Sequence, residues 1–224
     1  MLTRITEGLH VVAIPHTMLG LHLGTRMTVV TLPDGSLLVH SPIAPTPALR
    51  AAIDALGEVS TIVAPNLYHH VYAGAFEEAY PKAKFVGPRA LRKKRPDLRF
   101  DASFGEPGAL PAGVTAVHVP SMLDESVLYV PHLRTLVCAD LTENFGADAV
   151  THLPTRLYLK GSGILGTPGV ARPLRALFRD RRGCRRAIDE ILGFDFDRVT
   201  LAHGRIVETG GPEIVRASYD WLRG

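Results

Sequence analysis

The chain has 224 residues, of which 46% are hydrophobic and 21% are charged, and its net charge is +3. This composition is sufficient for a sizeable core and excludes a disordered chain or a disulfide-stapled miniprotein. The two cysteines lack CxxC spacing, which excludes a zinc ribbon and a disulfide framework. No apolar run reaches the roughly 18 residues of a membrane span. We therefore expect a cytoplasmic protein without membrane contact.

The first part of the chain predicts an antiparallel meander followed by a helix. Three β-branched runs are bounded by Gly or Pro, and Asp34-Gly35 supplies the turn before the third. Thr46-Pro47 then has the N-cap and first-turn chemistry of a helix that stops at Gly57. The expected strands cover residues 9–15, 25–32 and 37–42.

The rest of the chain mixes strands and helices, which predicts layered sheets with helices outside. Further strands are expected at residues 59–65, 84–87, 115–120, 126–131, 134–140 and 197–204. Helices are expected at residues 73–79, from about 172 to 192, and at 212–222, with a helix or loop at 89–95. Residues 145–169 are rich in glycine and show no clean period.

Polar side chains follow three of the expected strands. Asn66, Tyr68, His69 and His70 follow residues 59–65, Asp140 ends a second strand, and His203 ends a third. Loops at strand ends commonly carry functional groups because a rigid sheet aims them. Each residue also has an ordinary structural alternative, such as a cap, a turn or a packed histidine.

At these residues the sequence resembles the metallo-β-lactamase-fold hydrolases. The matching segments are "LPDGSLLVHSP", "TIVAPNLYHHVYAGAF", "VPSMLDESVLYVPHLRTLVCAD" and "LAHG", in the family's order over nearly the whole chain. More narrowly, it is similar to a subgroup described only as metal-dependent hydrolases. The resemblance implies an α+β fold, an αββα four-layer sandwich in one domain (1–224), with a helical Arg-rich addition at about 145–192.

The family motif H-x-H-x-D-H is degenerate in this chain. Aligning its last histidine with His70 puts His69 at the aspartate and leaves Pro65 and Leu67 at the first two histidines. The segment that resembles P-G-H-x-x-x-S has Met122 at the histidine, and a thioether is a poor substitute for imidazole on a borderline metal.

The remaining set implies at most one metal. His70, Asp140 and His203, with His69 as an extra candidate, suffice for one divalent ion, zinc or iron, with open positions. The resemblance assigns the catalytic role to Asp140 and His70 at such a site. His40 is a reserve candidate, and a site without any metal is the alternative.

Residues for substrate binding are expected beside the metal ligands and in a basic segment. Asn66, Tyr68 and Glu143 are candidates to orient ligands or substrate. Residues 172–186 contain seven basic residues and one acidic residue, and Arg179 and Arg182 in this segment are candidates to hold an anionic substrate. The alternative interpretation of this segment is a helix whose basic face is exposed to solvent. Nucleic-acid binding is disfavoured because aromatic stacking residues are scarce in the segment.

These observations favour an enzyme. We expect a hydrolase that acts on a small anionic ester, thioester or phosphoester, in a chain that can form a homodimer. The alternative is a catalytically inactive relative of the same fold that binds a partner and holds no metal. A third hypothesis is an anion or nucleic-acid binder that uses the arginines.

Overall fold

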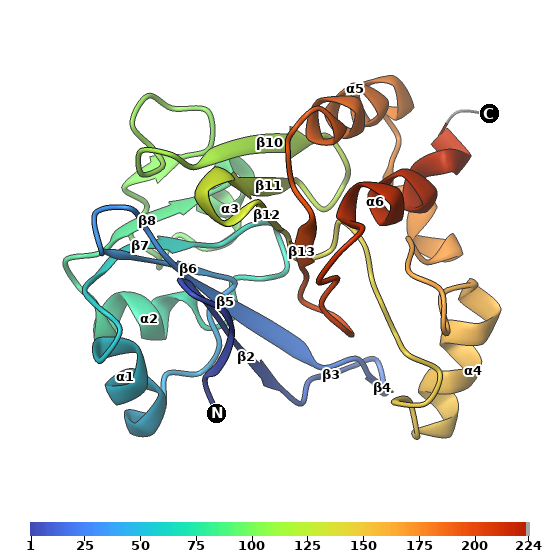
Figure 1. Ribbon diagram of the computed structural model, residues 1–224, viewed down its shortest axis with the longest axis horizontal. Helices are drawn as coiled ribbons and strands as arrows, with labels where there is room; N and C mark the ends of the chain where they lie inside the picture. The colour runs from blue at the N-terminus through green and yellow to red at the C-terminus, as the bar shows by residue number, and fades with distance from the viewer. Residues whose placement is uncertain (223–224) are drawn as a thin grey trace.

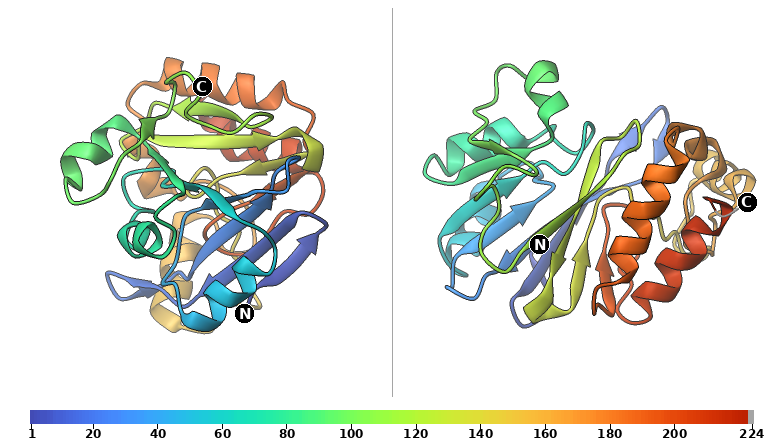
Figure 2. Two further views of the ribbon diagram at one scale, coloured as in Figure 1. Left: turned by 90° about the vertical axis from the view of Figure 1, so that its left-hand side faces the viewer. Right: turned by 90° about the horizontal axis from the view of Figure 1, so that it is seen from above.

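Two β-sheets lie face to face with helices on their outer faces. The computed structural model describes residues 1–222. Seen from above, the layers follow one another as helices, sheet, sheet and helices (Figure 2, right). This arrangement confirms the expected αββα sandwich.

The first sheet contains the N-terminal meander and continues with parallel strands. Its four leading strands pair antiparallel, the last three of them as the sequence predicted, and the later ones pair parallel with their neighbours. In sheet order the strands are β1 (Thr3–Thr6), β2 (Leu9–Ile14), β5 (Thr25–Thr31), β6 (Leu37–His40), β7 (Val59–Val63), β8 (Lys84–Gly87) and β9 (Ala102–Ser103). A separate small hairpin is formed by β3 (Thr17–Met18) and β4 (Leu21–His22) (Figure 1).

The second sheet has four strands. Its first three pair antiparallel, and its last two pair parallel with each other. In sheet order they are β10 (Thr115–Val119), β11 (Glu125–Val130), β12 (Thr135–Val137) and β13 (Arg198–Thr200). Because β12 and β13 run in the same direction, the segments that follow them emerge at the same edge.

Helices cover both outer faces of the sandwich (Figures 1 and 2). On the first sheet they are α1 (Pro47–Asp54), α2 (Ala73–Ala79) and α3 (Arg89–Lys94). On the side of the second sheet they are α4 (Leu153–Ser162), α5 (Arg181–Leu192) and α6 (Gly211–Tyr219). Short 3₁₀ turns are η1 (Pro131–Leu133), η2 (Arg172–Leu177) and η3 (Asp220–Leu222).

The strand periodicity explains the layers. In β6, Leu37 and Val39 pack toward the helices of the first sheet, whereas Leu38 packs between the two sheets. In β11, Val127 packs under α5 and α6, and Leu128 packs between the sheets. Strands with apolar residues on both faces must be covered on both sides, which is why their runs are almost continuously apolar.

The structure contains elements that the sequence did not predict. β1 and the β3–β4 hairpin are too short to give a clear alternating pattern. α4 lies in the segment that showed no period, because it exposes Leu153 and Leu157 while it buries Leu159. Such a helix has no clear apolar stripe to detect. No helix among residues 1–222 has the length and hydropathy that crossing a lipid bilayer requires.

Candidate metal centre

Three side chains from distant segments meet at one edge of the sandwich. His69 follows β7, Asp140 follows β12, and His203 follows β13. Asp140 Oδ1 lies 3.3 Å from His69 Nε2 and 3.2 Å from His203 Nε2. One donor atom from each residue lies within 4.8 Å of the other two. The three strand ends therefore converge, as their positions in the sequence predicted.

His69 is aimed by hydrogen bonds to its backbone and to its ring. Asn66 Oδ1 accepts from the backbone N–H groups of Tyr68 (2.9 Å) and His69 (2.8 Å), which closes the loop after β7 into a turn. Ser41 Oγ lies 2.8 Å from His69 Nδ1. The Nδ1 atom is therefore occupied, and Nε2 faces Asp140.

His203 is held by the beginning of β5. Its Nδ1 lies 2.8 Å from the carbonyl oxygen of Gly24, so that its Nε2 faces Asp140. The Arg26 guanidinium donates to the carbonyl oxygens of Leu201 and Gly204, each at 2.5 Å. These two bonds bracket His203 in the chain and fix the backbone that carries it.

Asp140 is surrounded by polar partners that fix its carboxylate. Asn66 Nδ2 donates to Asp140 Oδ2 at 2.7 Å, which leaves Oδ1 facing the histidines. The buried Glu125 carboxylate accepts from the backbone N–H groups of Ala139 (2.7 Å) and Asp140 (3.0 Å). Both bonds hold the chain where it leaves β12.

The electrostatics of the cluster follow from burial and from close charges. Burial by itself raises the pKa of Asp140, but His69 and His203 hold it well below its usual range. Burial lowers the pKa of His203, and its hydrogen bond to the Asp140 carboxylate then raises it to about 9. Burial and the Asp140 charge raise the pKa of Glu125 to about 8. Asp140 is therefore the ionised carboxylate of the pair.

This donor set fits one divalent ion. Two imidazoles and one carboxylate direct a donor atom each toward a common region, and each second polar atom is bound to the protein through Ser41, Gly24 or Asn66. Hydrogen bonds of this kind fix the tautomer and the direction of metal ligands in proteins. Three protein donors also leave coordination positions open.

The whole chain matches solved metallo-β-lactamase structures. The metallo-β-lactamase from Pontibacter korlensis has 13% sequence identity and a TM-score of 0.67, and the match covers 100% of this chain and 99% of that chain. The chain has the metallo-β-lactamase fold. FIM-1 from Pseudomonas aeruginosa, solved in its mono-zinc form, has 11% identity and a TM-score of 0.64, with 100% and 94% covered. The Flv1 flavodiiron core from Synechocystis sp. has 11% identity and a TM-score of 0.67, with 100% and 60% covered.

The comparisons of sequence match less of the chain than the comparison of structures does. A family model described as a domain of unknown function (DUF4336) matches residues 13–90. That segment includes His69 but neither Asp140 nor His203. Comparison with curated protein sequences gives no match.

Apolar residues replace the other ligands of the metallo-β-lactamase motif. Leu67 N–H donates to the carbonyl oxygen of Leu123 at 3.0 Å, and Ser126 N–H donates to that of Pro65 at 2.9 Å. These bonds join the loop after β7 to β11 and to the loop before it, and Met122 in that loop is 48% exposed. These three motif positions thus carry no imidazole, and His69, Asp140 and His203 are the group of the described residues that brings three donor atoms within 4.8 Å of one another.

His70 lies outside the cluster, which corrects its predicted place among the ligands. Its Nδ1 lies 3.0 Å from Arg95 Nη1, and because a guanidinium only donates, this nitrogen accepts. The proton is then on Nε2, which leaves the neutral ring no free lone pair for a metal. Burial and the charges of Lys94 and Arg95 lower its pKa, consistent with the neutral form. Adjacent residues in the turn point in different directions, and His69 is the one that reaches Asp140.

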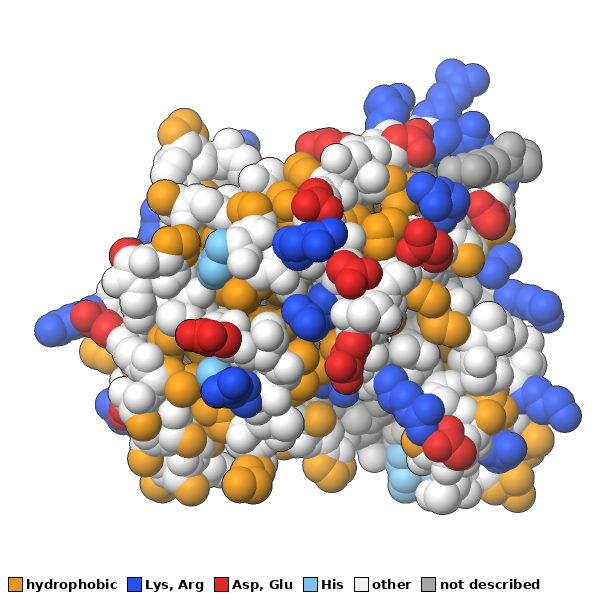
Figure 3. All heavy atoms as spheres, viewed as in Figure 1, with side chains coloured by type: hydrophobic (Ala, Val, Ile, Leu, Met, Phe, Trp, Pro, Cys, Tyr) orange, Lys and Arg blue, Asp and Glu red, His pale blue; other side chains and the backbone are white. Residues whose placement is uncertain are grey.

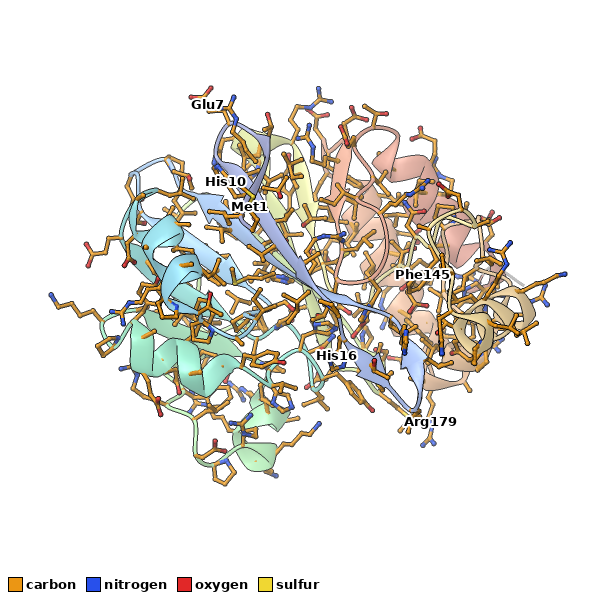
Figure 4. All side chains as sticks on the ribbon, turned by 90° about the horizontal axis from the view of Figure 1, so that it is seen from below. Met1, Glu7, His10, His16, Phe145 and Arg179 are labelled. Atoms are coloured by element: carbon orange, nitrogen blue, oxygen red, sulfur yellow. The ribbon has the colours of Figure 1, made fainter. Side chains whose placement is uncertain are left out.

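The predicted substrate-binding residues lie in different environments. Asn66 is completely buried, so it positions Asp140 and His69 and does not contact substrate. Tyr68 is 52% exposed and has Lys94 Nζ 4.9 Å from its ring centroid. Arg179 and Arg182 are exposed, and Arg179 reaches the periphery of the molecule (Figure 4).

Two further buried polar groups belong to this edge, Glu143, which the sequence made a candidate to orient ligands or substrate, and His40, its reserve candidate for a ligand. Burial raises the pKa of Glu143 to about 7, and its Oε2 has no hydrogen-bond partner in residues 1–222. Burial lowers the pKa of His40, the reserve candidate, to about 3, and its Nε2 is likewise unpartnered within the described chain. Glu125 was missed, although an acidic residue at the start of an apolar strand is an unusual signal.

Gly204 fixes the backbone beside His203 and provides a test of this geometry. Its φ is +86°, and a Cβ would lie 2.1 Å from the carbonyl oxygen of Asn144. We expect Gly204→Ala to lower the free energy of unfolding by about 3 kcal/mol or more, because strain and a backbone clash add. Gly113→Ala is the matched control, since it has φ +80° and open space around it. Urea unfolding of both variants checks this, and equal losses would contradict it.

Proposed function

We propose that the protein is a metal-dependent hydrolase with a mononuclear site formed by His69, Asp140 and His203. One observation carries the proposal: three donor atoms from three strand ends face one another, and the second polar atom of each residue is hydrogen-bonded to the protein. A cluster kept only for stability would not need this uniform orientation.

The site has the groups that hydrolysis requires. A zinc or iron ion held by the three donors would polarise a carbonyl or phosphoryl oxygen and make water more acidic. Glu143, with a pKa of about 7 and an unpartnered Oε2 among the described residues, is suited to hold or transfer a proton near neutral pH. The charge of Asp140 raises the pKa of Glu143 and the charge of His203 lowers it, so Glu143 interacts electrostatically with both residues.

The proposed substrate is a small anionic ester, thioester or phosphoester. The arginine segment supports this choice, because Met122 N–H donates to the carbonyl oxygen of Leu177 at 2.9 Å and so joins the segment to the loop at the rim. Arg179 and Arg182 follow that contact and have no carboxylate within 4 Å in the part of the chain described. Basic side chains also project at the upper right of Figure 3, the side on which Figure 1 places α5.

A second function is favoured by one specific observation. The apolar residues Pro65, Leu67 and Met122 occupy motif positions that carry ligands in the family pattern, and Asp140 already pairs with both histidines. A fold relative without metal, which acts by binding a partner, would show the same features. The two functions differ in whether the purified chain retains metal.

Metal analysis of the purified protein tests the proposal. We expect about one equivalent of zinc or iron after incubation with each ion and gel filtration, and less than about a tenth in Asp140→Ala, His203→Ala and His69→Ala. His70→Ala is the matched control, because the adjacent ring does not face the cluster, and it should retain the metal. Wild-type protein that holds no metal would support the binding protein instead.

Hydrolysis is then measured with the metal-loaded chain. The nitrophenyl monoester of succinic acid, a succinyl thioester with a free carboxylate and bis(nitrophenyl) phosphate represent the three anionic substrate classes. Turnover that disappears in Asp140→Ala and falls at least tenfold in Glu143→Gln supports the assigned roles. Turnover that is equal in wild type and Asp140→Ala would exclude this site as its origin.

A further inference from the structure

A pocket lies beside His203, and none of its lining residues belongs to the metal cluster. Its volume is about 340 Å³, and it is lined by the end of β2, the chain from His22 to Arg26, parts of the loop from Phe145 to His152 and the chain after β13. Ala202 and Gly204 line it on either side of His203, but none of the three candidate ligands does. Figure 4 shows Phe145, one of the lining residues, in the loop near α4.

Arg26 brings a positive charge without a counterion into the wall of this pocket. Its two terminal nitrogens donate only to the neutral carbonyls of Leu201 and Gly204, and its buried Nε has no partner among the described residues. No carboxylate within residues 1–222 lies within 4 Å of it. Buried charges in proteins are almost always paired, so an unpaired guanidinium in a pocket wall indicates a missing anion.

The remaining lining contains one further basic residue, two histidines and a majority of apolar groups. Arg205 lines the pocket and pairs with the exposed Asp148, which is not itself a lining residue. His22 and His152 stack with ring centroids 3.7 Å apart and also face the pocket. No Asp or Glu of the described chain lines it. Hydrocarbon is contributed by Ile14, Leu23, Phe145 and Val150.

We propose that this pocket binds a small organic acid, with a carboxylate as the counterion of Arg26 and an apolar body against the hydrocarbon lining. One uncompensated charge matches a monoanion, whereas a phosphate would bring two charges to a mostly apolar space. The proposal does not depend on a metal or on hydrolysis. Because Arg26 also fixes the backbone around His203, a bound acid would stabilise that backbone as well.

Hexanoate binding by the metal-free full chain, prepared with chelator, tests this. We expect saturable binding in calorimetry with a Kd in the millimolar range, as a ligand of this size permits, and a matching rise in the unfolding temperature. Hexylamine has the same chain with the opposite charge and should not bind. Asp140→Ala should bind hexanoate as the wild type does, which separates this pocket from the metal cluster.

Two tryptophan variants locate the ligand. Ala149 lines the pocket and Ala147 does not, although both are exposed in the same loop. Ala149→Trp should weaken hexanoate binding at least tenfold, and Ala147→Trp should leave it unchanged. The proposal is overturned if wild type does not bind hexanoate, if hexylamine binds equally well, if both tryptophan variants bind alike, or if Asp140→Ala abolishes binding.

Discussion

Metal affinity is expected to rise about a hundredfold between pH 6 and pH 8, because the ion must displace a proton from His203. The Asp140 carboxylate holds the pKa of His203 at about 9 against the effect of burial, so that this ring is protonated across the whole range. Displacing one proton gives about a tenfold rise in affinity for each pH unit below that pKa.

Competition titrations of zinc against a chromophoric chelator at pH 6, 7 and 8 measure the slope. Calorimetry at pH 7 in buffers of different ionisation enthalpy should show about one proton released for each ion bound. His132→Ala, in η1, removes a histidine outside the cluster and should leave the slope unchanged. An affinity that is flat from pH 6 to pH 8 would contradict the paired state of His203.

The same pairing predicts how the metal-free protein responds to pH. The pKa of His203 is higher in the folded chain than in the unfolded chain. Its contribution to the free energy of unfolding is therefore fully present below pH 6.5 and is lost as pH rises through about 9. Glu125, with a pKa of about 8, acts in the same direction, because the native state keeps a proton that the unfolded chain releases. We expect a loss on the order of 3 kcal/mol in urea unfolding between pH 6 and pH 9 from His203 alone. Saturating zinc should remove most of this loss.

Replacement of Glu125 is expected to destabilise the fold more than any exposed substitution. In Glu125→Leu the N–H groups of Ala139 and Asp140 lose their buried acceptor, which costs about 3–5 kcal/mol. Glu125→Gln keeps one acceptor oxygen and should lose about 1 kcal/mol. Chemical denaturation gives all three free energies of unfolding.

Glu190→Leu, on the exposed face of α5, is the control and should change stability by less than about 0.5 kcal/mol. The metal content of Glu125→Gln shows whether this substitution disturbs the metal cluster or only lowers the stability of the fold. Glu125→Gln should still bind zinc, although more weakly, because Asp140 and both histidines remain. Equal stability of Glu125→Leu and wild type would show that these two N–H groups do not depend on the carboxylate.

Much of the fold follows from local pattern. Three local patterns predict their elements correctly: the turn at Asp34-Gly35, the N-cap at Thr46 and the apolar run that forms β7. They do so because turn and cap hydrogen bonds and strand alternation involve only a few neighbouring residues. α4 and the β3–β4 hairpin were missed because neither has a continuous apolar face or sufficient length. Contacts with distant segments maintain them.

The sequence by itself determined that polar groups end three strands, and hence that Asp140, His203 and the histidine pair after β7 were candidates for one site. Only the tertiary structure decided which histidine takes part. Ser41 and Arg95 lie far from residues 69 and 70 in the chain, and their hydrogen bonds aim His69 at Asp140 and hold His70 away from it. Side-chain direction in a non-repeating loop depends on such distant partners, which no local periodicity encodes.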